Sequence, residues 1–194
     1  MKGTDHQDQA AEKIKELFLK GQITNVDQLN LVIGIQQKLD NVDLSEQFAN
    51  WKSSTILDPV NLNMLANILK EIPSDTQEAL ADWKPQLHSV WDPLLAVYFE
   101  KKQPKKIATF QEFWTAAVDS TMFDLNASHG RKYWGFQLVE KVLRRLSPEQ
   151  MPLIFTANFM RTFINNLSSE DRFLNKAARH TVSIITSQEK IYPH

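Results

Sequence analysis

Apolar residues recur three and four positions apart along most of this chain, and no stretch alternates apolar with polar residues over the length of a strand. This spacing is typical of amphipathic helices that bury one face. The sequence therefore predicts an all-α fold. We expect helices at about residues 9–18, 24–39, 43–52, 58–71, 110–124, 127–146, 148–154, 156–167 and 170–187. A further helix begins either at Asp92-Pro93 or, as we prefer, near Gln86 with a kink at Pro93.

Helix start signals support this interpretation. Asp58-Pro59 combines a capping residue with proline at the first helical position. Ser74–Gln77, Thr109–Glu112 and Ser147–Gln150 have the capping-box form, in which a hydroxyl and a Glu or Gln three residues later each bind the other's backbone N–H. Three such starts in one chain favour helices throughout.

The expected helices succeed one another at about 35–40 residues per pair, close to the period of HEAT and armadillo repeats. The last pair fits best, because Ala177 and Ala178 allow close helix approach while Val182 and Ile185 face the core. We expect residues 1–194 to form a single helical-repeat domain, a HEAT/armadillo-like α-solenoid segment of antiparallel helix pairs. A globular helical bundle is the alternative, since the repeats diverge strongly.

The segment 131–146 places its apolar residues on one stripe of a helix. The stripe consists of Gly135, Leu138, Val139, Val142, Leu143 and Leu146, with Trp134 and Phe136 on its flanks. We predict that these residues and the two alanines belong to the core, so that the rings are no platform for nucleic-acid bases. Gly135 costs about 1 kcal/mol of helix propensity relative to Ala, which indicates a neighbouring helix packed too close for a Cβ.

Charge is unevenly distributed although the net charge is only −1. Residues 1–97 hold 8 Lys and Arg against 14 Asp and Glu, whereas residues 98–194 hold 14 against 9. A basic half indicates either a face for an anionic partner or ordinary solvated surfaces. The candidate contacts are Lys101, Lys102, Lys105, Lys106, Arg131, Lys132, Arg161, Arg172, Lys176 and Arg179.

The sequence lacks the residue patterns that are typical of catalytic, phosphate-binding and metal-binding sites. The chain has no cysteine, its five histidines lack HExxH spacing, and it contains neither GxxxxGK[ST] nor GxGxxG. Asp92 and Asp119 stand singly beside apolar segments, whereas a polymerase needs at least two carboxylates at its metal ions. We expect no enzyme, catalytic residue, metal, cofactor or small-molecule substrate. No apolar run reaches the about 18 residues of a membrane helix, so we expect no membrane partner.

Three segments in this order resemble the DNA polymerase phi family, also called the Myb-binding protein 1A family and, in yeast, DNA polymerase V. They are WKPQLHSVWDPLLAVY (83–98), FQEFWTAAVDSTMFDLNASHGRKYWGFQLVEKVLRRL (110–146) and PLIFTANFMRTFINNLSSEDRFLNKAAR (152–179). The resemblance implies a fragment of a longer, helical-repeat protein of the nucleus and nucleolus. It also implies roles in ribosomal DNA transcription and large-subunit ribosome biogenesis, and, for animal members, binding to transcription regulators.

Two functions follow as hypotheses. The first is a non-catalytic scaffold that binds ribosome-assembly proteins or pre-ribosomal ribonucleoprotein. The second is direct binding of ribosomal RNA or ribosomal DNA through the basic half. Template-directed polymerase activity is supported by the family's name alone.

Overall fold

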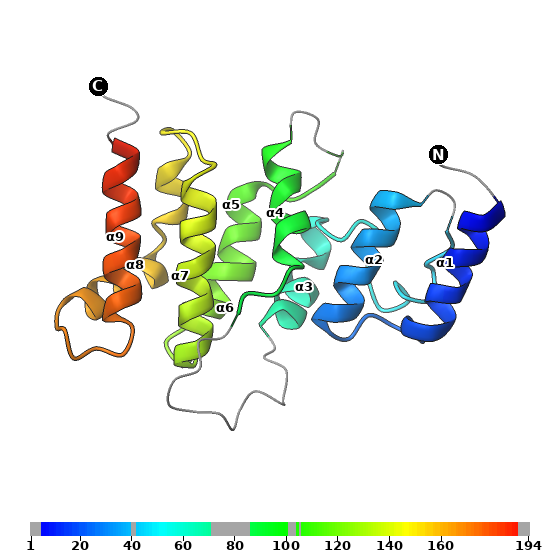
Figure 1. The fold of residues 1–194 in the computed structure, drawn as a ribbon, viewed down its shortest axis with the longest axis horizontal. Helices are drawn as coiled ribbons and strands as arrows, with labels where there is room; N and C mark the ends of the chain where they lie inside the picture. The colour runs from blue at the N-terminus through cyan, green and yellow to red at the C-terminus, as the bar shows by residue number, and fades with distance from the viewer. Residues whose placement is uncertain (1–4, 40–41, 71–85, 101–103, 105, 190–194) are drawn as a thin grey trace. The chain divides into compact units, whose positions relative to one another are not determined.

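The structure is a computed structural model that describes residues 5–39, 42–70, 86–100, 104 and 106–189 (Figure 1). Over these residues every regular element is helical and none is a strand. The prediction of an all-α fold is therefore confirmed. None of the helices traced in these ranges combines the length and the apolar character that crossing a bilayer requires.

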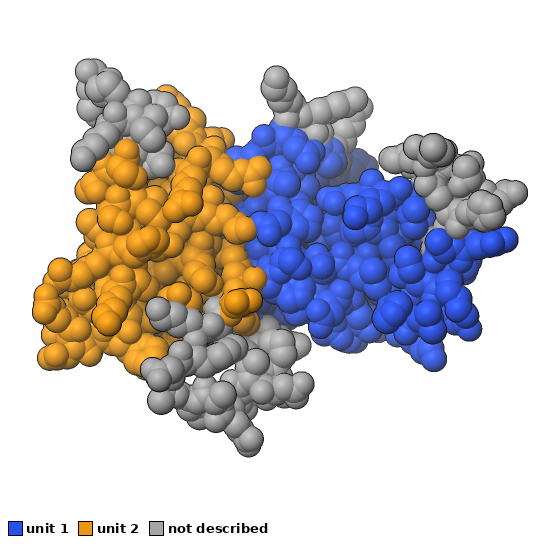
Figure 2. Space-filling model, in the orientation of Figure 1, with its two compact units in different colours: residues 1–71, 88–107 blue, residues 72–87, 108–194 orange. Residues whose placement is uncertain are grey.

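The chain forms two compact units, coloured separately in Figure 2. Unit 1 comprises residues 1–71 and 88–107, and unit 2 comprises residues 72–87 and 108–194. Each unit is described by itself below. The expectation of one repeat domain over 1–194 stays a prediction.

Unit 1 contains α1 (Asp5–Phe18), α2 (Val26–Lys38), η1 (Pro59–Asn61), α3 (Leu62–Leu69) and α4 (Trp91–Phe99). The helix starts follow the expected capping chemistry. Asn25 accepts a hydrogen bond from the Gln28 backbone N–H at the start of α2, and the Asp58 carboxylate accepts one from Val60 at the start of the 3₁₀ turn η1. After α1, Gly21 has a φ of 74°, which only glycine adopts without strain.

Two helix predictions in unit 1 are wrong. Residues 45–50 form a series of turns instead of a helix. The Gln47 carbonyl accepts the Ile23 N–H at 3.2 Å, so it is withdrawn from the ladder that a helix over 43–52 needs. The fourth helix begins at Trp91 and not near Gln86. Pro93 therefore lies in its first turn, where a missing N–H costs nothing, and the expected kink is absent.

Unit 2 contains α5 (Phe110–Trp114), the π-helical segment η3 (Thr115–Asp119), α6 (Ser120–Met122), α7 (His129–Leu143), the 3₁₀ turn η4 (Met151–Ile154), α8 (Ala157–Leu167) and α9 (Asn175–Glu189). The single helix expected over 110–124 is thus interrupted by a π-helical turn. The helix expected over 148–154 is a 3₁₀ turn, and the last helix begins at Asn175 instead of 170. The Thr109–Glu112 capping box is complete, whereas Ser74–Gln77 lies outside the described residues.

The core of unit 2 is aromatic. Phe123 contacts Phe136 edge-on with ring centroids 5.8 Å apart and Phe159 at 5.1 Å, and Phe159 stacks on Phe163 at 5.1 Å. Helix α7 packs against α6 and η3 through its apolar stripe and also against α9, beside which it stands in Figure 1. Because α7 is covered from several sides, most of its polar positions are half-buried.

Candidate nucleic-acid interface

Four of the candidate lysines lie in the basic segment KKQPKK, residues 101–106. Lys101, Lys102 and Lys105 lie outside the described residues. Lys106 belongs to unit 1, is exposed, and has a φ of 63°, a left-handed conformation uncommon for a side-chain-bearing residue. The structure therefore describes one lysine of this segment.

Two of the predicted contact residues donate to backbone carbonyls at and after the end of α6. Arg161 donates from Nη2 to the carbonyl of Phe123, the C-cap residue of α6, at 3.2 Å, where the carbonyl lacks an intrahelical donor. Lys132 donates from Nζ to the Leu125 carbonyl, in the connection between α6 and α7, at 3.1 Å. Both side chains therefore have a structural role within unit 2.

A third candidate, Arg179, is also engaged. Its Nε donates to Asn175 Oδ1 at 3.1 Å, and its Nη2 forms an ion pair with Glu170 at 2.7 Å. Both side chains of this pair are largely exposed. Like other surface ion pairs, it therefore adds well under about 1 kcal/mol to the free energy of unfolding. It nevertheless neutralises Glu170 at the turn before α9.

The remaining three candidates carry no side-chain partner among the described residues: Arg131, Arg172 and Lys176. Arg131 and Lys176 lie in the first turns of α7 and α9, and Arg172 lies in the turn before α9. Neither first turn contains an acidic residue. Cations in first turns oppose the helix dipole, so helix stability does not explain these two positions.

An exposed aromatic pair lies at the same end of α7 and α9. Phe173 is 72% exposed and contacts the ring of His129, with centroids 4.8 Å apart and planes inclined by 45°. His129 is the first residue of α7 and Phe173 lies two residues before α9, so the contact joins the starts of the two helices. We call His129, Phe173, Arg131, Arg172 and Lys176 the aromatic–basic patch.

The sequence-predicted core residues are where the apolar stripe places them. Trp134, Gly135, Phe136, Leu138, Val142 and Leu143 are buried in unit 2, Ala178 is fully buried and Ala177 is half-buried. Their rings are thus not open to bases. In α9 the buried face is formed by Asn175, Ala178, Thr181 and Ile184, so the assignment of Val182 and Ile185 to it is corrected, since both are only half-buried.

Gly135 has the close neighbour that the stripe indicated. A Cβ built on it would lie 2.5 Å from Cζ of Phe123 and under 3 Å from two further atoms of that ring. The neighbour is therefore the side chain at the end of α6 and not a helix backbone. Phe123 is fully buried against Phe136 and Phe159, so its ring has no room to move away.

Asp119 is buried, and its carboxylate caps a helix from a distance. Oδ1 accepts from the Phe159 backbone N–H at 3.0 Å and from the Thr156 hydroxyl, and Oδ2 accepts from Asn158 Nδ2 at 3.0 Å. Thr156 stands at the N-cap of α8, where its side chain accepts no backbone N–H, and its hydroxyl donates to Asp119. Carboxylates are stabilising at helix N-termini. Asp119 thus has a structural role, which sequence reasoning missed.

A second network missed from the sequence joins α7 to α9. Glu140 Oε1 accepts from the Thr181 hydroxyl at 3.0 Å and lies 2.9 Å from His180 Nδ1. Thr181 is fully buried. Glu140 lies on the polar side of the predicted α7 stripe and becomes half-buried because α9 packs against α7.

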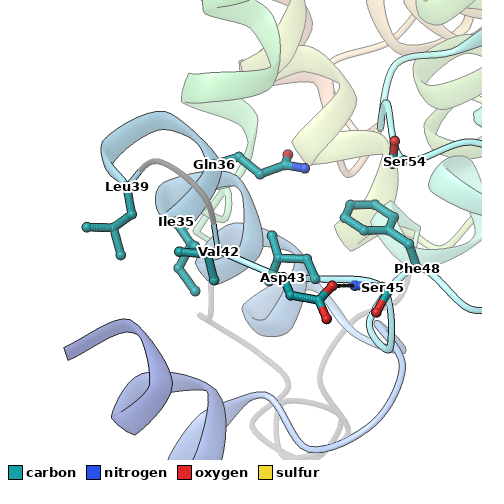
Figure 3. A pocket seen from close by; sticks show the side chains of 9 residues that line it. Ile35, Gln36, Leu39, Val42, Asp43, Ser45, Phe48 and Ser54 are labelled. Carbon is teal, nitrogen blue, oxygen red and sulfur yellow. Dashed lines mark hydrogen bonds between the residues drawn. The ribbon is translucent and has the colours of Figure 1, made fainter. Parts of the chain in front are cut away.

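Neither metal-binding clusters nor a reactive pocket emerges over the ranges that the structure covers. No three His, Asp or Glu side chains converge among the described residues. A hollow of about 580 Å³ in unit 1 is lined mainly by Ile35, Leu39, Val42 and Phe48, with Asp43 as its acid (Figure 3). The Ser45 backbone N–H donates to Asp43 at 2.9 Å and lowers the pKa of that carboxyl below its ordinary value. A single hydrogen-bonded carboxylate cannot perform metal-dependent chemistry alone.

The sequence matches the model of one protein family and two curated proteins. Residues 1–191 match the family model of DNA polymerase phi. The chain is 35% identical over 156 residues to the rDNA transcriptional regulator pol5 of Schizosaccharomyces pombe, an alignment that covers 79% of this chain and 16% of that protein. It is 28% identical over 162 residues to the rDNA transcriptional regulator POL5 of Saccharomyces cerevisiae, covering 70% and 16%. The chain thus spans about a sixth of the length of these relatives, and no solved structure matches it.

Proposed function

Because this chain belongs to the DNA polymerase phi family, we propose that it is a non-catalytic scaffold segment acting in ribosomal DNA transcription and large ribosomal subunit biogenesis. Its partners under this proposal are ribosome-assembly proteins or pre-ribosomal ribonucleoprotein, and its place of action is the nucleolus. The names of the two yeast relatives, both rDNA transcriptional regulators, support the part of the proposal that concerns transcription.

The observation that best supports a non-catalytic role is the hydrogen bonding of Asp119, the buried acid of unit 2. Asp119 is 6% exposed, and its two oxygens accept three hydrogen bonds at the start of α8. Three of the roughly four acceptor positions of this carboxylate are thus taken by protein donors, so helix capping explains its burial without a metal ion. Trp134 and Phe136, which also attract attention in the sequence, are buried in the core.

We further propose the HEAT/armadillo-like arrangement for this scaffold. In unit 2, α8 and α9 are joined by a short turn and pack against each other, and α7 packs against α9. Helices stacked on neighbours in this way form elongated binding surfaces in repeat proteins. An experimental structure of a longer piece supports this if further helix pairs continue the stack, and a closed bundle contradicts it.

Affinity purification of the tagged protein from its own cells, with and without RNase, tests the scaffold function. We expect ribosome-assembly proteins to be recovered and to survive RNase. Their loss on RNase treatment would indicate an RNA bridge instead. Recovery of neither assembly proteins nor ribosomal DNA would overturn the proposal.

Direct binding of ribosomal RNA or ribosomal DNA is a second candidate function, favoured by the three cations that have no partner in unit 2: Arg131, Arg172 and Lys176. Each phosphate contact releases counterions, so log affinity falls with log salt by about 0.7 per contact for single strands. Gel-shift titrations at two salt concentrations measure this slope. An absence of binding at about 50 mM salt rules this function out.

A further inference from the structure

We propose that the aromatic–basic patch binds single-stranded nucleic acid, with one base stacked on the Phe173–His129 pair. This inference rests on the second candidate function and gives it a site and a strand preference.

The ring of Phe173 has no structural need for its position. It is 72% exposed, whereas Phe123, Phe136 and Phe159 in the same unit are almost fully buried. Its described aromatic neighbour is His129, which is itself exposed. An open aromatic face is what a nucleobase stacks on, and such stacking tolerates every base.

The charges near these rings suit a polyanion. Arg172 adjoins Phe173 in the chain, Lys176 follows in the first turn of α9, and Arg131 follows His129 in the first turn of α7. None of the three forms an ion pair with a described residue. An aromatic face bordered by free cations meets both the base and the phosphate of a nucleotide.

Two acidic residues lie in the same turn and limit the charge. Glu170 is paired with Arg179. Asp171 is exposed, and its side chain has no partner among the described residues. Asp171 therefore opposes an approaching phosphate, which supplies a variant of opposite sign for the test.

A single strand fits this patch better than a duplex because stacking needs an exposed base face. In a duplex the neighbouring base pairs cover each base face. Flipping one base out of the duplex costs on the order of a few kcal/mol. Three cations alone give a duplex a weak, charge-driven interaction.

Fluorescence anisotropy of the 194-residue chain tests the proposal with three labelled probes of equal length: oligouridine, an abasic single strand and a duplex. Phe173→Ala should weaken oligouridine binding about tenfold, within the range known for stacking on one aromatic residue. It should leave the salt slope and the abasic affinity unchanged. Phe173→Tyr keeps the ring and should bind as the unaltered chain does.

The charge variants give the complementary result. Arg172→Gln and Lys176→Gln should each reduce the salt slope by about 0.7, and Asp171→Asn should tighten binding to both single strands. Ile164→Ala is the matched control, since Ile164 is apolar and 60% exposed on α8 without belonging to the patch.

Each failure has a distinct meaning. Unchanged oligouridine affinity in Phe173→Ala, or equal affinity for the duplex, overturns the stacking site while direct binding stands. No oligouridine binding at about 50 mM salt overturns both. The scaffold function is decided separately by the purification with RNase.

Discussion

Gly135 and Asp119 are the two positions where a single atom or charge decides the packing of unit 2. A Cβ at Gly135 would overlap the buried ring of Phe123. The Asp119 carboxylate supplies acceptors that no other described residue offers to the start of α8. Each therefore yields a sharp expectation for substitution.

We expect Gly135→Ala to destabilise the protein by about 2 kcal/mol, since overpacking a filled core costs about 1–3 kcal/mol or more and helix propensity returns about 1 kcal/mol. Urea unfolding followed by circular dichroism measures the change. Gly34→Ala is the control, because nothing lies within 4 Å of a Cβ there and α2 should gain stability. Equal effects of the two substitutions would contradict this account of Gly135.

We expect Asp119→Ala to destabilise the protein by about 2–4 kcal/mol, because it leaves buried donors of Thr156 and Phe159 without acceptors. The same unfolding measurement applies. Asp171→Ala serves as the control, since its exposed side chain has no described partner. A loss below about 0.5 kcal/mol for Asp119→Ala, the size of an ordinary surface substitution, would refute the capping role.

The sequence predicted one of these two positions. Gly135 lies in the middle of a regular apolar stripe, where glycine is costly, so a close neighbour could be predicted although Phe123 could not be identified. Asp119 follows Ala-Ala-Val, and its partners come 37 to 40 residues later. Local patterns carry no information on such distant pairs.

Among the elements, the segment 110–122 departs most from its sequence pattern. Its start was predictable, because the Thr109 and Glu112 side chains bind each other's backbone N–H. The π-helical turn η3 within it was not, because a π turn has no residue signature comparable to a capping box. Residues 45–50 show the converse, since the helical spacing there did not produce a helix and the Gln47 carbonyl accepts the Ile23 N–H instead.

The capping box predicts a pH dependence for the start of α5. The Thr109 backbone N–H and hydroxyl, both 2.8 Å from Glu112 Oε2, lower the pKa of Glu112 below its ordinary value of 4.5. A lowered folded-state pKa means that the stabilisation is complete above about pH 4.5 and is lost as pH falls through the folded value.

We therefore expect Glu112→Gln to lower the melting temperature at neutral pH and to approach the unaltered protein as pH falls below the ordinary Glu pKa of 4.5. Thermal unfolding across this pH range measures the difference between the two proteins. Asp43 and Glu149 also have lowered pKa values, and their effects cancel because both proteins contain them. A difference that is constant with pH would contradict the ionic part of the cap.

At the scale of the whole molecule, the all-helical class could be predicted because periodicity and caps agree over most of the chain. The two compact units could not, because no glycine- or serine-rich linker marks a boundary and residues 72–87 and 88–107 are assigned to different units. The division of the cations into engaged and free groups also depended on tertiary packing, as Lys132 and Arg161 illustrate.

The whole chain should not incorporate nucleotides. Primer extension with Mg²⁺ and nucleoside triphosphates is expected to give no product, because the buried Asp119 is consumed by helix capping and no acidic cluster forms among the described residues. The variant Asp119→Ala should likewise give no extension product. Extension by the chain that stops on chelation would restore the polymerase hypothesis.

The long-range cap of α8 has an evolutionary consequence. Thr156 and Asn158 both donate to the carboxylate at position 119, so these hydrogen bonds exist only while that carboxylate is present. In relatives that replace Asp119 with an apolar residue, position 156 should shift towards Ser, Asp or Asn, whose side chains cap a helix better than that of Thr. Substitutions at 119, 156 and 158 should accordingly be inherited together, as a correlated trio across the divergence of the family.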